Sequence, residues 1–165
     1  MQPLETIIGD YNPFLNKIFD NLEKDGINVA NYELDHLCYR VAEQTRYEEL
    51  KQVLLQYGTL LTEAQVGGRA VSTFHLNEPL RFGEREIPCI ELPAPKESSY
   101  YSEGYEHVEF VIDLDFPSFI KQYPQVDFDT KSMNNKINPD VKIDYSGYSV
   151  KFHHHSLKEV IERWG

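Results

Sequence analysis

The sequence predicts an α+β protein made of two tandem βαβββ modules, preceded by an added N-terminal helical segment. The main observation is a repeat. Residues 34–41 (LDHLCYRV) and 105–112 (YEHVEFVI) both place a histidine after an acidic residue and before an apolar one. Both segments alternate polar and apolar residues, which is typical of half-buried strands. Helix and strand signals then follow in a similar order in both halves, which indicates a duplicated unit.

Length and composition limit the class of protein. With 165 residues, 41% of them hydrophobic, the chain is expected to fold as one domain rather than stay disordered. The net charge of −11 argues against binding to nucleic acid or to an anionic membrane surface. No apolar run is long enough to span a membrane, and the first residues lack the pattern of a secretory signal. Two cysteines, Cys38 and Cys89, suit a reducing compartment, so a cytoplasmic location is expected.

Residues 1–30 are expected to form the N-terminal helical extension. Apolar residues recur there at helical spacing. Asn12 and Pro13 suit an N-cap followed by the first position of a helix, so two helical pieces are predicted. The second piece is expected to run from Pro13 to about Lys24 and to end before Gly26.

Residues 31–93 are expected to form the first module. Thr45 and Glu48 fit a capping box at the start of a helix, which Gly58 is expected to end. The predicted strands are residues 34–41, 60–66, 70–76 and 87–92, joined by a turn at Gly67-Gly68 and a loop through Pro79 and Gly83.

Residues 94–104 are rich in proline, serine and glycine, and they are predicted to link the two modules. The second module, residues 105–165, begins with the repeated strand, and Pro117 suits the start of a short helix after it. The remaining signals are weak strands near 126–129 and 136–144, a turn at Ser146-Gly147, a strand over 148–153 and a C-terminal helix capped by Ser156.

Strand alternation predicts which side chains share the polar face, because the apolar face is expected to pack against helices. If the modules curl around one cavity, its wall collects His36, Arg40, Arg69, His75, Glu91, His107, Glu109 and Lys151. Two imidazoles and a carboxylate on rigid strands are a typical ligand set for a divalent transition metal with open positions. Such a metal can polarise a substrate oxygen or activate water. Cys38 and Cys89 are expected to line the cavity as small neutral groups.

The order of elements and the positions of His36, Glu91 and His107 resemble the vicinal oxygen chelate superfamily. That group includes glyoxalase I, extradiol dioxygenases, methylmalonyl-CoA epimerase and bleomycin-resistance proteins. Four strings resemble the YecM family of small bacterial proteins more closely: LDHLCYRV, ELPAPK, EGYEHVEFVI and SLKEVI. The resemblance covers nearly the whole chain. It implies a curved mixed sheet around a cavity that can hold a metal, but no particular reaction, because the superfamily contains both enzymes and binding proteins.

The resemblance also implies metal ligands on the first and fourth strands of each module. By position these are His36 and Glu91 in the first module and His107 in the second. The implied metal is a divalent ion such as Zn, Fe, Mn or Ni.

Lys151 occupies the fourth ligand position and departs from this pattern, because a protonated lysine cannot coordinate a metal. Either three protein ligands suffice, or a neighbour such as Glu109 or His75 substitutes. In the remaining alternative, Lys151 pairs with Glu91 and takes the space of the metal.

Two classes of function are therefore expected. The first is a metal-dependent isomerase, lyase or oxidoreductase, in which Glu109 or His75 moves protons on a small oxygenated substrate. The second is a metal-free protein that binds a small molecule, whose carboxylate or phosphate is held by Arg40, Arg69 and Lys151. In the run of three histidines at 153–155, only the first is predicted to face the cavity. A monomer and a homodimer are both compatible with the sequence.

Overall fold

The computed structural model describes residues 1–97, 100 and 102–164, and it has the predicted α+β fold. The helices are α1 (Glu5–Ile8), α2 (Asn12–Lys24), α3 (Gln44–Leu54), α4 (Phe116–Lys121) and α5 (Leu157–Trp164). The strands are β1 (Glu33–Arg40), β2 (Gly58–Val66), β3 (Arg69–Phe82), β4 (Arg85–Pro93), β5 (Gly104–Val111), β6 (Asp140–Asp144) and β7 (Ser149–His153).

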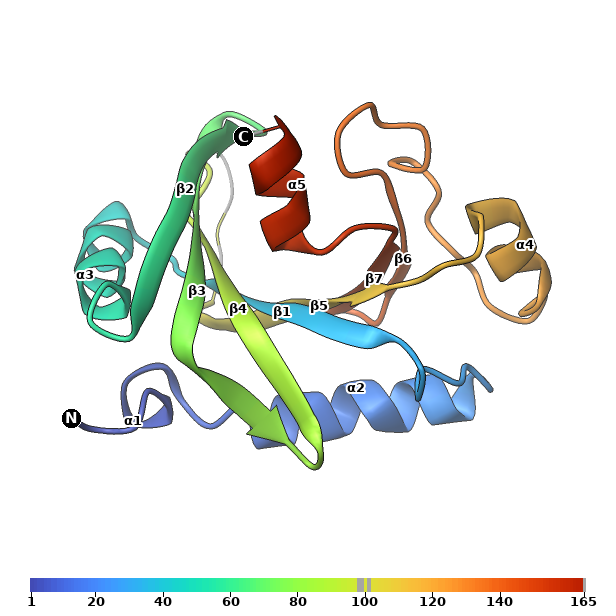
Figure 1. Cartoon of the computed structure of the whole chain (residues 1–165), viewed down its shortest axis with the longest axis horizontal. Coiled ribbons are helices and arrows are strands. Elements are labelled where there is room, and N and C mark those ends of the chain that lie inside the picture. Colours follow the sequence, from blue (N-terminus) through green and yellow to red (C-terminus); the bar gives the residue numbers. More distant parts are fainter. Residues whose placement is uncertain (98–99, 101, 165) are drawn as a thin grey trace.

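All seven strands belong to one curved mixed sheet in the order β2-β3-β4-β1-β5-β7-β6. The two histidine strands, β1 and β5, are antiparallel neighbours at its centre. Each of them pairs in parallel with the last strand of its own module, β4 or β7. Figure 1 shows α2 along one face of the sheet and α5 over the opposite, concave face. The duplication therefore brings the two repeat strands side by side.

The apolar side chains of the strands face α2 and α4. Phe19 of α2 contacts Phe110 of β5 edge to face, with ring centroids 6.0 Å apart. Phe119 of α4 contacts Phe152 of β7 at 4.7 Å. The rings of Phe110, Phe152 and Phe119 are all fully buried. Because side chains alternate along a strand, the intervening polar residues point to the other face, which α5 covers.

The helix ends differ in part from the predicted ones. Asn12 is the first residue of α2 rather than its cap, and its amide donates to the Asp10 carboxylate. Thr45 lies inside α3, which begins one residue earlier after Glu43, so the capping box is not formed. Ser156 caps α5 as predicted, since its hydroxyl accepts a hydrogen bond from the Glu159 amide.

Gly58 begins β2 instead of ending α3. A Cβ atom at this position would lie 2.3 Å from the carbonyl oxygen of His75, so the close approach of β2 and β3 requires glycine. The predicted loop through Pro79 is also wrong, because β3 continues to Phe82. Pro79 lies where the β3–β4 register is interrupted, which is a place where a strand tolerates proline.

In the described part of the second module there are three strands, because the weak signal at 126–129 corresponds to a single bridge between Asp129 and Lys142. The Asp129 side chain accepts a hydrogen bond from the Lys131 amide and turns the chain immediately after the bridge. The signal at 136–144 becomes β6, and the turn at Ser146-Gly147 leads into β7 as predicted.

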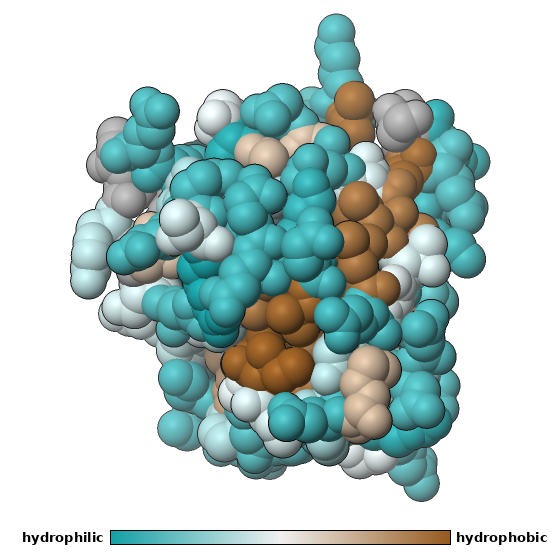
Figure 2. Space-filling view, turned by 90° about the vertical axis from the view of Figure 1, so that its left-hand side faces the viewer, coloured by the Kyte–Doolittle hydropathy of each residue, from teal (hydrophilic) through white to brown (hydrophobic). Residues whose placement is uncertain are grey.

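The predicted linker lies between β4 and β5, although its residues 98, 99 and 101 fall outside the described part of the chain. Among the described residues, no helix has the length and apolar character needed to cross a membrane. Figure 2 shows the side of the molecule formed by α3 and β2, where hydrophobic residues gather among hydrophilic ones. Leu55, just after α3, and Val66, at the end of β2, are exposed large apolar residues.

Candidate metal centre

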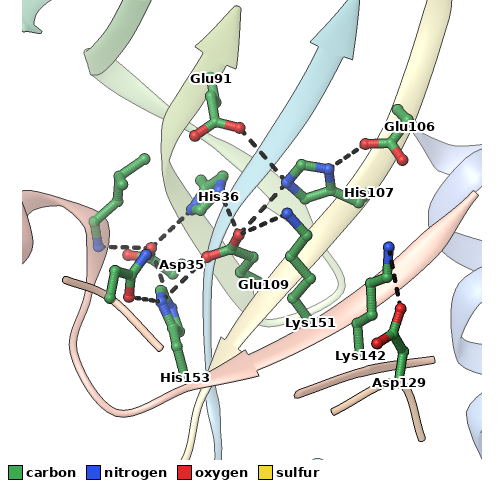
Figure 3. Close-up of polar contacts among 12 residues, drawn as sticks. Asp35, His36, Glu91, Glu106, His107, Glu109, Asp129, Lys142, Lys151 and His153 are labelled. Atoms are coloured by element: carbon green, nitrogen blue, oxygen red, sulfur yellow. Dashed lines mark hydrogen bonds and ion pairs between the residues drawn. The ribbon is translucent and has the colours of Figure 1, made fainter. Parts of the chain in front are cut away.

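Two adjacent rows of side chains cross the centre of the sheet. The strand register aligns one row as His75, Cys89, His36, Glu109, Lys151 and Lys142, from β3 to β6. The second row consists of Thr73, Glu91, Cys38, His107, Ser149 and Asp144. Figure 3 shows that the charged groups from the middle of these rows converge. The predicted metal ligands therefore come from neighbouring positions on β4, β1 and β5.

His36 is held in one orientation by Asp35. Its Nδ1–H donates to Asp35 Oδ2 at 2.8 Å, and both side chains are buried. A break in the β1–β5 register between Leu34 and His36 marks an irregularity at Asp35. A carboxylate that accepts from Nδ1–H fixes the tautomer and leaves the lone pair on Nε2.

His107 has the same arrangement in the second module. Its Nδ1 is paired with the carboxylate of Glu106, the residue that precedes it. His107 is 4% exposed, and its ring centroid lies 5.9 Å from that of His36. The acidic residue before each repeat histidine thus orients that histidine.

The Nε2 atoms of His36 and His107 face two carboxylates. His107 Nε2 lies 3.6 Å from Glu91 Oε1 and 3.5 Å from Glu109 Oε1. His36 Nε2 lies 3.7 Å from the same Glu109 oxygen. Within the described residues, neither Nε2 atom has a hydrogen-bond partner, although both are buried.

These separations match those around a metal ion. A tetrahedral ion with bonds of about 2.1 Å separates its ligand atoms by roughly 3.4 Å. The ligand atoms of His36, Glu91 and His107 all lie within 4.8 Å of one another. Buried imidazole nitrogens without partners are costly, and a bound cation would satisfy them. The donor set fits a divalent transition metal.

Lys151 lies beside this group and pairs with Glu109, its register partner on β5. Its Nζ is 3.8 Å from Glu109 Oε1, and the side chain is 26% exposed. Burial lowers the pKa of Lys151, but Glu109 and Glu91 raise it, and the net shift is upward. Lys151 is therefore a cation beside the centre and not a ligand.

His153 joins the centre from the end of β7. Its Nδ1 lies 3.1 Å from Glu109 Oε2 and 2.9 Å from Asn138 Oδ1, and its Nε2 lies 3.6 Å from Asp35 Oδ2. The predicted orientation of His153 toward the other polar side chains of the sheet agrees with these contacts. His154 stacks on Phe116, outside the centre.

Opposite charges shift the pKa values of the buried groups. Burial raises the pKa of Glu109, but His36, His153, His107 and Lys151 lower it, to well below its usual value. Burial lowers the pKa of His36, whereas Glu109 and Asp35 raise it, and the net shift is upward. The pKa of His107 is also raised, because its contacts with Cys38 and Glu106 outweigh burial and Lys151.

Burial keeps the two cysteines neutral. It raises the pKa of Cys38 to about 11 and that of Cys89 to about 12. Both thiols are free and buried. In the metal-free protein these residues therefore lie beside the imidazoles as neutral groups.

Three other predicted residues lie at the edge of this arrangement. His75 is in the His36 row but two strands away, which corresponds to about 10 Å between backbones. Arg40 is close enough to Glu106 to lower the pKa of that carboxyl. Arg69 begins β3 and donates to the carbonyl of Ala94 at 3.5 Å. His75 is therefore separated from His36 by β4.

A family model of the YecM protein matches residues 3–163 of the chain. The chain belongs to the YecM family. Protein YecM of Escherichia coli K12 is 26% identical over 174 residues, which cover 96% of this chain and 92% of that protein. A solved structure titled structural genomics protein EC4020 has a TM-score of 0.81 at 25% identity, and the match covers 100% and 98% of the two chains. The match to the YecM family thus extends over the whole fold.

The fold is also similar to that of a solved protein of another name. A methylmalonyl-CoA epimerase of Streptomyces coelicolor, in complex with 2-nitronate-propionyl-CoA, has a TM-score of 0.54 at 12% identity. The match covers 75% of this chain and 97% of the epimerase. At this identity the likeness concerns the fold alone.

Three residues of the candidate metal centre were not among the predicted site residues: Asp35, Glu106 and His153. The first two were visible in the sequence as the acidic residue before each repeated histidine. Strand alternation assigns them to the opposite face, so their contact with the histidines was not expected. His153 was predicted to face the cavity, but its contacts with Asp35 and Glu109 depend on how the second module folds.

Proposed function

We propose that this chain binds one divalent transition metal at His36, Glu91 and His107, with Glu109 as the fourth ligand. The observation that supports this most is the pair of buried Nε2 atoms, which face carboxylate oxygens at 3.5–3.7 Å. Zn, Fe, Mn and Ni all suit a set of imidazoles and carboxylates. The metal-bound protein would act on a small oxygenated molecule as an isomerase, a lyase or an oxidoreductase.

Glu109 takes the role that the superfamily pattern gives to the residue at Lys151. The two modules have the same register: Cys38 pairs with Glu91 in the first, and Glu109 pairs with Lys151 in the second. The acidic group of the second module is therefore on β5 instead of β7. Because both positions lie in one row, the exchange keeps a carboxylate next to the two imidazoles.

A bound metal would act as a Lewis acid toward a substrate oxygen. Lys151 carries a proton at Nζ beside that place, so it can donate a hydrogen bond to a substrate oxygen or stabilise negative charge on it. Glu109 has two oxygens: Oε1 faces the imidazoles, and Oε2 faces His153. Among the described residues, Glu109 Oε2 has no hydrogen-bond partner, so this oxygen can serve as a ligand or as a base.

Access to the centre is limited to one side. His36 and His153 are fully buried, whereas the side chains of Glu91 and Lys151 are 19% and 26% exposed. A substrate would therefore approach past these two residues. The buried side excludes water, which strengthens electrostatic interactions with a bound molecule. The ligand we infer is a small molecule and not a nucleic acid.

A metal-free protein that binds a small anion is the second candidate. It is favoured by the ion pair between Lys151 and Glu109, because protonated His36 and His107 can neutralise the remaining carboxylates without a metal. In that case the cationic groups would hold a carboxylate or a phosphate.

Thermal unfolding with added Zn²⁺ or Mn²⁺ separates the two candidates. A metal at 100 times its dissociation constant stabilises a protein by about 2.7 kcal/mol. For a chain of this size we expect a rise in melting temperature of roughly 5–10 °C. Glu91→Gln should abolish the rise, whereas Glu86→Gln, on the same strand but exposed and paired with Arg81, should retain it. No rise in the unaltered chain would favour the metal-free candidate.

A further inference from the structure

One carboxylate oxygen connects the candidate metal centre to the C-terminal helix. Asp35 Oδ2 accepts a hydrogen bond from His36 Nδ1–H at 2.8 Å and another from the Leu157 amide at 2.8 Å. Asp35 is 1% exposed, so these bonds do not compete with bulk water. Leu157 is the first residue of α5. The residue that orients His36 therefore also binds the start of α5.

The Leu157 amide is a donor that the helix itself cannot satisfy. The first four N–H groups of an α-helix lack partners within the helix. Ser156 accepts from Glu159, so its hydroxyl serves a different amide of the first turn. The negative charge of Asp35 also lies at the positive end of the helix dipole. The contact is thus favourable both as a hydrogen bond and as a charge interaction.

The helix α5 covers the face of the sheet that carries the polar rows. It starts beside β7 and extends toward β2, which it contacts at the opposite edge of the sheet (Figure 1). Leu157 and Val160 are buried against the rest of the chain. His153, four residues before the helix, lies between Asp35 and Glu109. The docking of α5 therefore closes the buried side of the centre.

We propose that Asp35 is a positioning residue that couples metal binding at His36 to the docking of α5. This inference rests on the proposed function. With α5 docked, the Leu157 amide and His36 share one fixed carboxylate, and Nε2 of His36 points at Glu91 and Glu109. Without the helix, Asp35 loses one of its two donors, and its own orientation is less restricted. Because coupling between two equilibria is reciprocal, a metal that binds the docked form more tightly must stabilise α5 by the same factor.

The pair Leu157→Pro and Leu157→Ala tests the coupling. Both variants lose the leucine side chain, but only proline removes the N–H that Asp35 binds. Proline is tolerated at the first position of a helix, and the residue before it favours the extended conformation of an N-cap. The two readouts are the Zn²⁺ dissociation constant, measured by competition with a chromogenic chelator, and hydrogen exchange of the α5 amides with and without Zn²⁺.

We expect Leu157→Pro to bind Zn²⁺ about 5- to 10-fold more weakly than Leu157→Ala. This loss of affinity is smaller than the 10- to 100-fold loss that is typical when an orienting carboxylate is removed. Zn²⁺ should slow exchange in α5 by a similar factor in Leu157→Ala, and by less in Leu157→Pro. Asp35→Asn, which has the shape of aspartate, should show the same loss of coupling if the proline variant does not fold.

Equal Zn²⁺ affinities for the two Leu157 variants, together with equal slowing of exchange in α5, would overturn the coupling and leave the proposed function intact. No Zn²⁺ binding by the unaltered chain would overturn the proposed function, and the coupling with it. The two failures are thus distinguished by the unaltered chain.

Discussion

Glu109 and Lys151 are register partners on the parallel strands β5 and β7, and their charged groups approach to 3.8 Å. The equivalent pair in the first module is Cys38 and Glu91. Cys38 and Glu109 each lie two residues after the repeat histidine on the same strand, and each pairs with a residue of the last strand of its module. The second module therefore carries its carboxylate on the histidine strand and a lysine where the first module has its carboxylate. This exchange places the ammonium group of Lys151 next to a site whose other side chains suit a metal cation.

Removal of the Lys151 amine should strengthen metal binding. Lys151→Met removes a positive charge beside the centre and frees Glu109 Oε1, so we expect the Zn²⁺ dissociation constant to fall about tenfold or more. Lys142→Met is a matched control. Lys142 is the register partner of Lys151 on β6, but its amine pairs with Asp129 and Asp144 at 3.8 Å. An unchanged or weaker affinity for Lys151→Met would show that the amine does not compete with a metal.

Glu109→Gln should weaken both metal binding and the metal-free fold. Glu109 is 5% exposed and lies within 4 Å of three histidines and Lys151. Loss of its charge leaves buried cations without a partner, which typically costs about 3–5 kcal/mol. Urea denaturation of the metal-free protein measures this cost. If Glu109→Gln unfolds at the same urea concentration as the unaltered chain, the carboxylate does not hold the centre together.

The stability of the metal-free protein should depend on pH because His107 gains or loses a proton. Its folded pKa is raised above the usual value of 6.5, so its protonation stabilises the fold below pH 6.5. That contribution is lost as the pH rises through the folded pKa. The difference in melting temperature between the unaltered chain and His107→Gln should therefore be larger at pH 6 than at pH 9. A difference that stays constant over this range would mean that His107 is neutral in the metal-free protein.

His75 should not contribute to metal affinity. It lies in the same row as His36 but two strands away, on β3. We expect His75→Ala to bind Zn²⁺ within about twofold of the unaltered chain, whereas His36→Ala should lose at least a hundredfold. Isothermal titration of both variants compares them directly. Equal losses would place His75 in the centre and would require a rearrangement of β3.

Much of the fold follows from local patterns in the sequence. The alternation around His36 and His107 predicted two strands, each with a polar face carrying its histidine. The structure contains both strands, and it pairs them with each other, which was not predicted. The turns at 67–68 and 146–147 were visible because glycine tolerates the positive φ angles found at Gly67, Gly68 and Gly147. The continuation of β3 past Pro79 was missed, because an interrupted register can absorb a proline that usually breaks a strand.

The centre itself was less predictable than the fold. Alternation placed Glu109 on the right face, but only the register between β5 and β7 shows that it pairs with Lys151. Asp35 was assigned to the opposite face, because a regular strand directs adjacent side chains apart. An irregularity in β1 changes this, and its presence depends on pairing with a distant strand. Contacts set by long-range pairing cannot be deduced from a single segment.

Elemental analysis of the protein, purified without a histidine tag, tests the metal centre most directly. The protein would be measured as isolated and after incubation with divalent ions and removal of the excess. We predict about one equivalent of a divalent transition metal per chain, and none in His36→Ala and His107→Ala. No bound metal after any supplementation, with an unchanged melting temperature, would contradict the proposed centre.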